Sequence, residues 1–312
     1  YMLQLDYIID SFSKTKVRKM KPFIRNLLRM SVYQIKYMDA VPDSAVCNEA
    51  VKLAKRHKFA QLSGFVNGVL RNIARNIDSV QFDTLSIRYS MPQWIVDRFV
   101  AAYGEKKAEE IFKAFHNKST ISIRTNLTRC TPDELRATLE AEGVTVTAVD
   151  ELDYAFVISG FDYLNGLQSF RDGLFYVQDI SSMLVAQTAA PKKGDYVIDV
   201  CAAPGGKSTH IAELLQGSGH VLARDLTDNK VGMIEENIDR HGLKNMSAEV
   251  WDATVPDADS AGKADILICD LPCSGLGVLG RKKDIRYKMT PESVDELAAL
   301  QRQILDLSLI HI

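Results

Sequence analysis

The stretch YVIDVCAAPGGKST, residues 196–209, decides the fold of the second half of the chain. Its first five residues are an apolar run typical of a buried strand, and the turn that follows contains Pro204, Gly205 and Gly206. Lys207 then opens a segment with helical character. A strand, a tight glycine turn and a helix in this order predict one unit of an α/β sheet. Because glycine has no Cβ, a ligand can lie directly against the backbone of such a turn.

Three further apolar runs follow, separated by helical segments, and an aspartate comes directly after each run. The runs cover residues 220–224, 247–251 and 264–269, and the aspartates are Asp225, Asp252 and Asp270. This alternation predicts a parallel sheet with crossover helices. Ligands bind such sheets at the carboxyl ends of the strands, so we expect the glycine turn and the three acids to share one site.

A phosphate-binding P-loop is the first candidate for the glycine turn. That motif needs Gly, four residues and then Gly-Lys-Ser/Thr, but Cys201 stands where the first glycine belongs, and GxGxxG is absent as well. The pattern suits S-adenosylmethionine better. Lys207 and the turn amides would hold its carboxylate, Asp225 would hold its ribose, and Asp252 would lie near the base. The predicted cofactor-binding residues are Cys201, Ala202, Ala203, Pro204, Gly205, Gly206, Lys207, Asp225, Asp252 and Asp270.

A second segment of chemical interest, DLPCSGLGVLGRKKDIRYK, covers residues 270–288. Asp270 and Cys273 lie in a turn at a strand end, on the edge where the methyl donor would bind, although a lone cysteine can equally serve packing. The cations that follow, with an interleaved aromatic, suit a phosphate backbone with one stacked base; a solvated loop has the same composition. The predicted RNA-binding residues are Arg281, Lys282, Lys283, Arg286 and Lys288.

The front of the chain is organised differently. Residues 1–76 repeat apolar positions at helical spacing and carry 14 Lys/Arg against 5 Asp/Glu, a net charge of +9, whereas the remainder carries −11. Such a module favours contact with a polyanion, although solvated lysines give the same count. Gly64 and Gly68 lie four residues apart on one helical face, and we expect another backbone to approach closely there. Strands and a capped helix after residue 119 predict a small α+β module.

Composition narrows the class of protein. The chain is 46% hydrophobic and 25% charged, which is typical of globular domains. No run of 18 apolar residues appears, and the first residues lack the order of a signal peptide. Five cysteines without a CxxC pair are typical of a reduced, cytoplasmic protein. We expect a monomer in the cytoplasm, with no membrane and no metal among its partners.

Taken together, these motifs resemble the bacterial 16S ribosomal RNA cytosine-carbon-5 methyltransferases of the Sun/Fmu (RsmB) type. CAAPGGKS and DLPCSGLGV look like the family's S-adenosylmethionine loop and Pro-Cys motif, while SGFVNGVLRNI, YSMPQW and VQDISS match its front domain and linker. The resemblance implies a multi-domain chain. Its parts are an all-α NusB-like RNA-binding domain (1–76), a helical linker (77–118), a small α+β RRM-like RNA-binding module (119–175) and an α/β Rossmann-like methyltransferase domain (176–312).

The resemblance also implies a reaction, namely S-adenosylmethionine-dependent methylation of carbon 5 of one cytosine in 16S rRNA through a covalent Cys–cytosine adduct. Asp270 would hold the N3/N4 edge of the cytosine, and Cys273 is linked in this family to release of the adduct. The attacking cysteine belongs to a separate Thr-Cys motif further on, and no cysteine follows Cys273. We therefore expect a fragment, cut at the C-terminus and also at the N-terminus, that cannot complete turnover.

Two alternatives stay open. DNA cytosine methyltransferases attack with a Pro-Cys cysteine, so Cys273 could in principle be the nucleophile. A different class of function is a non-catalytic RNA-binding or assembly factor in which the NusB-like front is the working part.

Overall fold

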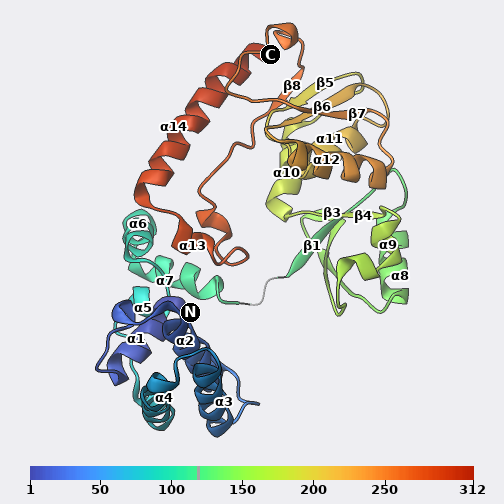
Figure 1. The fold of residues 1–312 in the computed structure, drawn as a ribbon. Coiled ribbons are helices and arrows are strands. Elements are labelled where there is room, and N and C mark those ends of the chain that lie inside the picture. Colours follow the sequence, from blue (N-terminus) through green and yellow to red (C-terminus); the bar gives the residue numbers. More distant parts are fainter. Residues whose placement is uncertain (118–119) are drawn as a thin grey trace. The chain divides into compact units, whose positions relative to one another are not determined.

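The computed structural model describes residues 1–117 and 120–312, and the chain divides into two compact units (Figure 1). The first unit comprises Tyr1–Asn117 and Gly275–Met289, and the second comprises the chain from β1 (Ile121–Thr125) to Ser274 together with Thr290–Ile312. The expected limit between linker and small module, at 118/119, lies outside the described residues. None of the helices described is both long and apolar enough to cross a bilayer.

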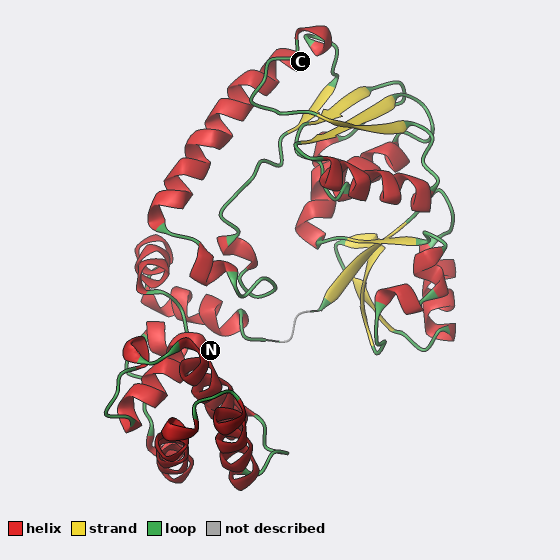
Figure 2. Cartoon of the chain, viewed as in Figure 1, coloured by secondary structure: helices red, strands yellow, loops and turns green. Residues whose placement is uncertain are grey.

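The first unit is helical throughout, as the apolar spacing predicts (Figure 2). Its helices in the front module are α1 (Met2–Phe12), α2 (Pro22–Tyr37), α3 (Asp43–Arg56) and α4 (Ser63–Asn76), followed by α5 (Leu85–Arg88), α6 (Gln93–Tyr103) and α7 (Glu105–Ala114). Ile8, Leu28 and Leu70 are fully buried in one core. The close approach expected at Gly64 and Gly68 is wrong, because no described atom outside their own helix lies within 4 Å of where a Cβ would stand.

A second core in this unit includes a distant part of the chain. Leu279, four residues after Gly275, is fully buried with Met91, Ile95 and Phe112 of the connector. The segment also carries the short helix α13 (Ile285–Lys288). The residues that follow the Pro-Cys motif are therefore part of the helical unit.

The second unit begins with a small antiparallel sheet in the order β2-β3-β1-β4. Its elements are β1, α8 (Pro132–Ala141), β2 (Thr145–Val149), β3 (Leu152–Ser159), α9 (Gln168–Arg171) and β4 (Phe175–Val177). The capping box between Thr131 and Glu134, expected at the start of α8, is present. Ile123 and Phe175 pack with Leu135 and Leu139 of α8.

A parallel sheet follows in the order β7-β6-β5-β8. Its strands are β5 (Tyr196–Asp199), β6 (His220–Asp225), β7 (Met246–Val250) and β8 (Ile266–Ile268), and its helices are α10 (Ile180–Ala189), α11 (Gly206–Leu214), α12 (Asp228–His241) and α14 (Pro291–Ser308). The four predicted strands are confirmed. One core joins Val197 to Ile211 and Ile234, and another joins Ile198 to Ile304 of α14. Helices thus pack on both sides of β5, and the carboxyl ends of β5, β6 and β8 meet at one edge (Figure 1).

Candidate active site

The turn after β5 is fixed by its neighbours at that edge. The Ala203 amide donates to the Asp225 carboxylate at 3.0 Å, and the Tyr176 hydroxyl donates to the Pro204 carbonyl at 3.1 Å. Gly205, with φ of 102°, takes the left-handed conformation that glycine tolerates best and stands just before α11. The backbone of the turn is therefore held in one shape before any ligand arrives.

A cavity of about 160 Å³ lies against this turn. The predicted cofactor residues that line it are Cys201, Ala202, Ala203, Pro204, Gly206, Lys207 and Asp270. Asp199, Tyr176 and Gln178, which the sequence analysis did not select, line it too. A Cβ at Gly206 would lie 3.2 Å from the ring of Tyr176, so a side chain at this position would press on the cavity wall.

Lys207 and Asp270 come together across the cavity from two strand ends. The Lys207 ammonium donates to the Asp270 carboxylate at 2.5 Å, and the Asp270 side chain is 59% exposed. A cation and an anion thus stand side by side. The Lys207 ammonium can reach an anionic ligand, and the Asp270 carboxylate is open to a second substrate.

The other two predicted acids behave differently from each other. Asp225 is buried, and it accepts from the amides of Ala203 and Leu226 and from the Lys230 ammonium. Only one of these donors, Ala203, reaches its Oδ2, so this oxygen keeps acceptor capacity as far as the described residues show. Asp252 is exposed and accepts from the amide and hydroxyl of Thr254 in its own turn. Neither Asp225 nor Asp252 is among the residues that line the cavity.

Two acidic groups at the turn, the buried Asp199 and the half-buried Cys201, have pKa values above their ordinary ones. Burial raises the pKa of Asp199 to about 6, against the hydrogen bonds donated by the Ser208 hydroxyl at 2.6 Å and the Cys201 amide at 3.4 Å. Burial likewise raises the pKa of the Cys201 thiol to about 12, with Asp225 and Asp199 adding to the shift. Cys201 therefore stays a neutral thiol in the wall of the cavity and is no nucleophile.

Gln178 supplies a donor without an acceptor. Its Oε1 accepts from Arg124 Nε at 2.8 Å, whereas its buried Nε2 has no hydrogen-bond partner among the described residues. Arg124 is itself buried and ion-paired with Glu213 of α11, so the amide is held in place from behind. A buried amide donor normally finds an acceptor. Because Lys207 lines the same cavity, a free amide donor at Gln178 fits the carboxylate of S-adenosylmethionine. Gln178 belongs to the motif VQDISS, but the motif alone gives this glutamine no role.

All five cysteines are described, and Cys273 is the one among them that is exposed. The neighbouring Pro272 carbonyl accepts from Gln301 of α14 at 2.8 Å. The turn that carries Cys273 is thus anchored while its thiol is free of cover.

The predicted basic segment is not one uniform surface. Lys282 and Lys283 are exposed, and Arg281 is exposed as well. Lys288 is exposed and pairs with Asp284 at 2.6 Å. The expectation of an exposed Arg286 is wrong, because this side chain is 2% exposed and donates to the carbonyl oxygens of Tyr89, Ser90 and Leu279 inside the first unit. A run of cations in sequence does not show which one turns inward.

No group of three His, Cys, Asp or Glu side chains gathers as metal ligands would within residues 1–117 and 120–312.

Three family models match successive parts of the chain. The NusB family matches residues 1–75, the ferredoxin-like domain of RsmF/B-like methyltransferases matches 91–161, and 16S rRNA methyltransferase RsmB/F matches 186–312. Among solved structures, PH0851 superposes with a TM-score of 0.84 at 24% identity, over 100% of this chain and 72% of that one. NSun6 from Pyrococcus horikoshii, solved with SFG, gives 0.63 at 21% identity over 71% of this chain and 80% of that one. These two likenesses show the fold.

Curated relatives are similar over nearly the whole chain. The probable ribosomal RNA small subunit methyltransferase B of Bacillus subtilis is 38% identical over 97% of this chain and 69% of its own length. The ribosomal RNA small subunit methyltransferase B of Proteus mirabilis is 32% identical over 97% of this chain and 71% of its own length.

Parallel sheet, glycine turn and strand-end cavity define an S-adenosylmethionine-dependent methyltransferase. The helical front and the ferredoxin-like module in the same chain narrow this class of methyltransferases to those that combine all three parts. The chain belongs to the ribosomal RNA small subunit methyltransferase B family.

Proposed function

We propose that the protein methylates carbon 5 of a cytosine in 16S ribosomal RNA through a covalent Cys–cytosine adduct. The observation that carries the cofactor part of this proposal is the cavity at the strand ends. It places around one space a glycine turn, an ammonium and a buried amide donor that has no partner in the described part of the chain. Membership of the family supports rRNA as the substrate, and rRNA in turn implies a cytoplasmic site of action.

The cofactor would lie along the turn. Lys207 and Gln178, which line the cavity, would donate to its carboxylate. Asp225, whose Oδ2 holds the Ala203 amide of the turn, would accept from a ribose hydroxyl. Asp252 is proposed for the base edge, where its exposed carboxylate can rotate away from Thr254. When bound, S-adenosylmethionine supplies the methyl group as an electrophile.

Preparation of the cytosine would need an attacking thiol, which is not among the 312 residues, together with Asp270 of this chain. Carbon 5 becomes nucleophilic when a thiolate forms a bond to carbon 6 and the ring's electron pair moves toward carbon 5. Asp270, exposed beside the cavity, would receive the N3/N4 edge and steady the charge that develops there. After methylation, the carbon-5 proton leaves to a base and the carbon–sulfur bond breaks with its electron pair on sulfur, which restores the aromatic ring and the thiolate.

Cys273 has the exposure that a reacting thiol needs, and we propose for it the release of the adduct. The attacking thiol would come from the Thr-Cys motif of the family, which is not among the 312 residues. We therefore expect this chain to bind cofactor without completing turnover. Methylation of a 16S rRNA fragment by the 312-residue chain, abolished by Cys273→Ser, would instead make Cys273 the nucleophile.

Calorimetric titration with S-adenosylmethionine tests the cavity directly. Gln178→Glu keeps the oxygen that Arg124 needs but replaces the amide donor by a carboxylate, so we expect cofactor affinity to fall by about tenfold or more. Gln168→Glu, the same change at an exposed position of α9, is the matched control and should leave affinity unchanged. Absence of cofactor binding by the unaltered chain, with RNA still bound, would favour the non-catalytic RNA-binding factor.

A further inference from the structure

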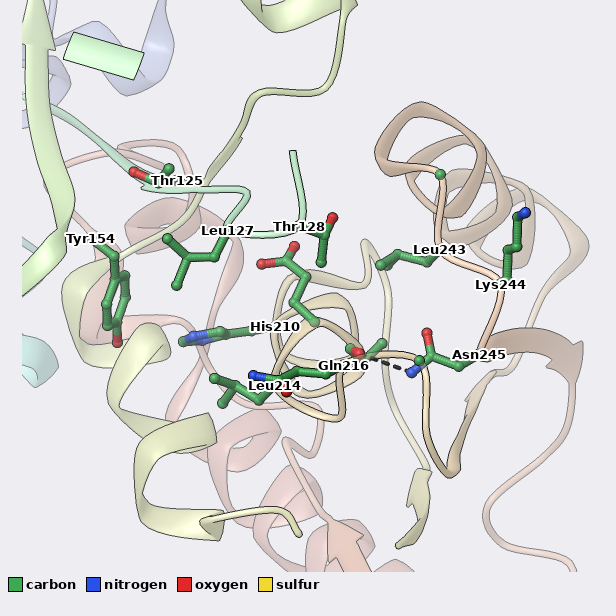
Figure 3. A pocket seen from close by; sticks show the side chains of 14 residues that line it. Thr125, Leu127, Thr128, Tyr154, His210, Leu214, Gln216, Leu243, Lys244 and Asn245 are labelled. Carbon is green, nitrogen blue, oxygen red and sulfur yellow. Dashed lines mark hydrogen bonds between the residues drawn. The ribbon is translucent and has the colours of Figure 1, made fainter. Parts of the chain in front are cut away.

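The second unit contains another cavity, of about 510 Å³, that shares no residue with the cofactor cavity (Figure 3). It lies where the ferredoxin-like module meets the far end of α11 and the loop before β7. Its volume falls within the range of about 300–1,000 Å³ that small-ligand sites occupy. Nothing in the proposed methyl transfer uses it.

Four polar atoms without a hydrogen-bond partner among the described residues are buried in the wall of this cavity. They are Thr125 Oγ1, Tyr154 Oη, His210 Nδ1 and Glu213 Oε1, on side chains that are all more than nine-tenths buried. Figure 3 shows His210 extending from α11 toward Tyr154, and the two rings pack edge to face at 5.4 Å. Buried polar atoms are bonded in the great majority of cases. Four polar atoms in the wall of one cavity that lack a partner in the described chain favour a polar occupant.

The charge of the cavity selects an uncharged occupant. Burial and the nearby Arg124 lower the pKa of His210 to about 2, so its imidazole is neutral. The other carboxyl oxygen of Glu213, Oε2, pairs with Arg124 behind the wall, so the acid brings no uncompensated charge. Two hydroxyls, a neutral imidazole and a carboxyl oxygen offer both donors and acceptors.

The rest of the wall suits a flat ring. Leu127, Leu214 and Leu243 supply apolar surface to the same cavity that the ring of Tyr154 lines. Lys244, exposed on the same rim, is a cation within reach of a phosphate. A nucleobase has apolar faces and an edge of donors and acceptors, and its backbone carries the phosphate.

We propose that this cavity receives an unpaired base of the RNA substrate other than the methylated one. The inference rests on the proposed function. Helix α11 connects the two sites, with its start at the cofactor turn and its end at this cavity, about 12 Å apart along the helix. Stacking and edge contacts of this kind are how proteins hold splayed bases in single-stranded RNA.

Binding of the four nucleoside 5′-monophosphates and of a 16S rRNA fragment to the 312-residue chain tests the proposal. Thr125→Val and Tyr154→Phe each remove one hydroxyl with little change of shape, and each should weaken both ligands about three- to tenfold. Thr147→Val and Tyr163→Phe make the same changes at exposed positions of the same unit and should have no effect. Thermal melts of all four variants confirm folding.

Three results would overturn the inference. The first is that no monophosphate binds at millimolar concentration and crystals show only water at the four atoms. The second is that the cavity variants match the controls. The third is that monophosphates bind and respond to the variants while RNA affinity does not, which would assign the cavity to a free nucleotide. Photo-crosslinking of RNA containing 4-thiouridine to Tyr154 or His210 gives a second measurement without variants. Cofactor titration of the same samples separates failure here from failure of the methyltransferase proposal.

Discussion

The buried pair of Arg124 and Glu213 gives the sharpest prediction about stability. Their side chains are 1% and 3% exposed, and Arg124 also donates to Gln178 Oε1 and to Thr209 Oγ1 at 3.1 Å. Arg124→Met removes the cation and leaves the Glu213 carboxyl in the interior with His241, whose Nδ1 lies 3.8 Å from Glu213 Oε1 and whose pKa burial lowers to about 3, so that the imidazole is neutral. Breaking a buried pair in this way costs about 3–5 kcal/mol of unfolding free energy. Arg302→Met, the same change on an exposed position of α14, should cost about 0.5 kcal/mol or less.

The cost should depend on pH with a definite sign. Burial already raises the pKa of Glu213 to about 7, against the attraction of Arg124. Without Arg124 that pKa rises further, while the unfolded value stays near 4.5. The folded state then binds the extra proton, so the stability of the variant falls as pH rises from about 4.5 through the folded pKa, by at most about 1.4 kcal/mol per pH unit. The unaltered chain loses stability in the same way up to about pH 7, so the cost of Arg124→Met grows only above that pH. Glu213→Leu in the same chain should remove the pH dependence and recover most of the loss.

Urea unfolding followed by tryptophan fluorescence measures these effects. The chain has two tryptophans, Trp94 in the first unit and Trp251 in the second. A Trp94→Phe background makes the emission report on the second unit, and titrations at pH 5, 7 and 9 give the slope. A loss below about 1 kcal/mol for Arg124→Met, or a double variant no more stable than the single one, would refute this account of the pair.

Further predictions concern single positions. Asp199→Asn can keep both hydrogen bonds and removes a buried charge. Because the folded pKa of Asp199 is about 6, its ionised form is penalised above pH 6, and the substitution should stabilise the protein by about 2–3 kcal/mol at pH 8. The gain should vanish near pH 4, and a gain independent of pH contradicts the assignment. Gly173→Ala should destabilise by about 3 kcal/mol or more in urea unfolding, because φ is +64° and the new Cβ would lie 2.0 Å from a backbone oxygen. Gly64→Ala meets open space in a helix and should gain about 0.5–1 kcal/mol; a loss would reveal a contact there. Iodoacetamide should modify Cys273 first, and mass spectrometry locating the fast site elsewhere would contradict its exposure.

Local pattern was enough to predict the parallel sheet and the turn. Each strand from Tyr196 onward is a short apolar run closed by a polar residue, and that pattern does not depend on distant parts of the chain. The role of Gln178 could not be predicted this way, because the arginine that fixes it lies 54 residues earlier and β4 is only three residues long. Arg286 was misplaced for the same reason, since its partners Tyr89 and Ser90 are almost 200 residues away.

The ion pair between β1 and α11 also bears on how this chain can be dissected. An excised piece that starts at the glycine turn or at α10 would expose the side of α11 that carries Thr209 and Glu213, with no guanidinium to meet it. Grafting a foreign RNA-binding front onto the catalytic sheet would meet the same difficulty unless the graft retained the strand Ile121–Thr125. For protein engineering, the ferredoxin-like module is thus an integral wall of the methyltransferase and no detachable accessory.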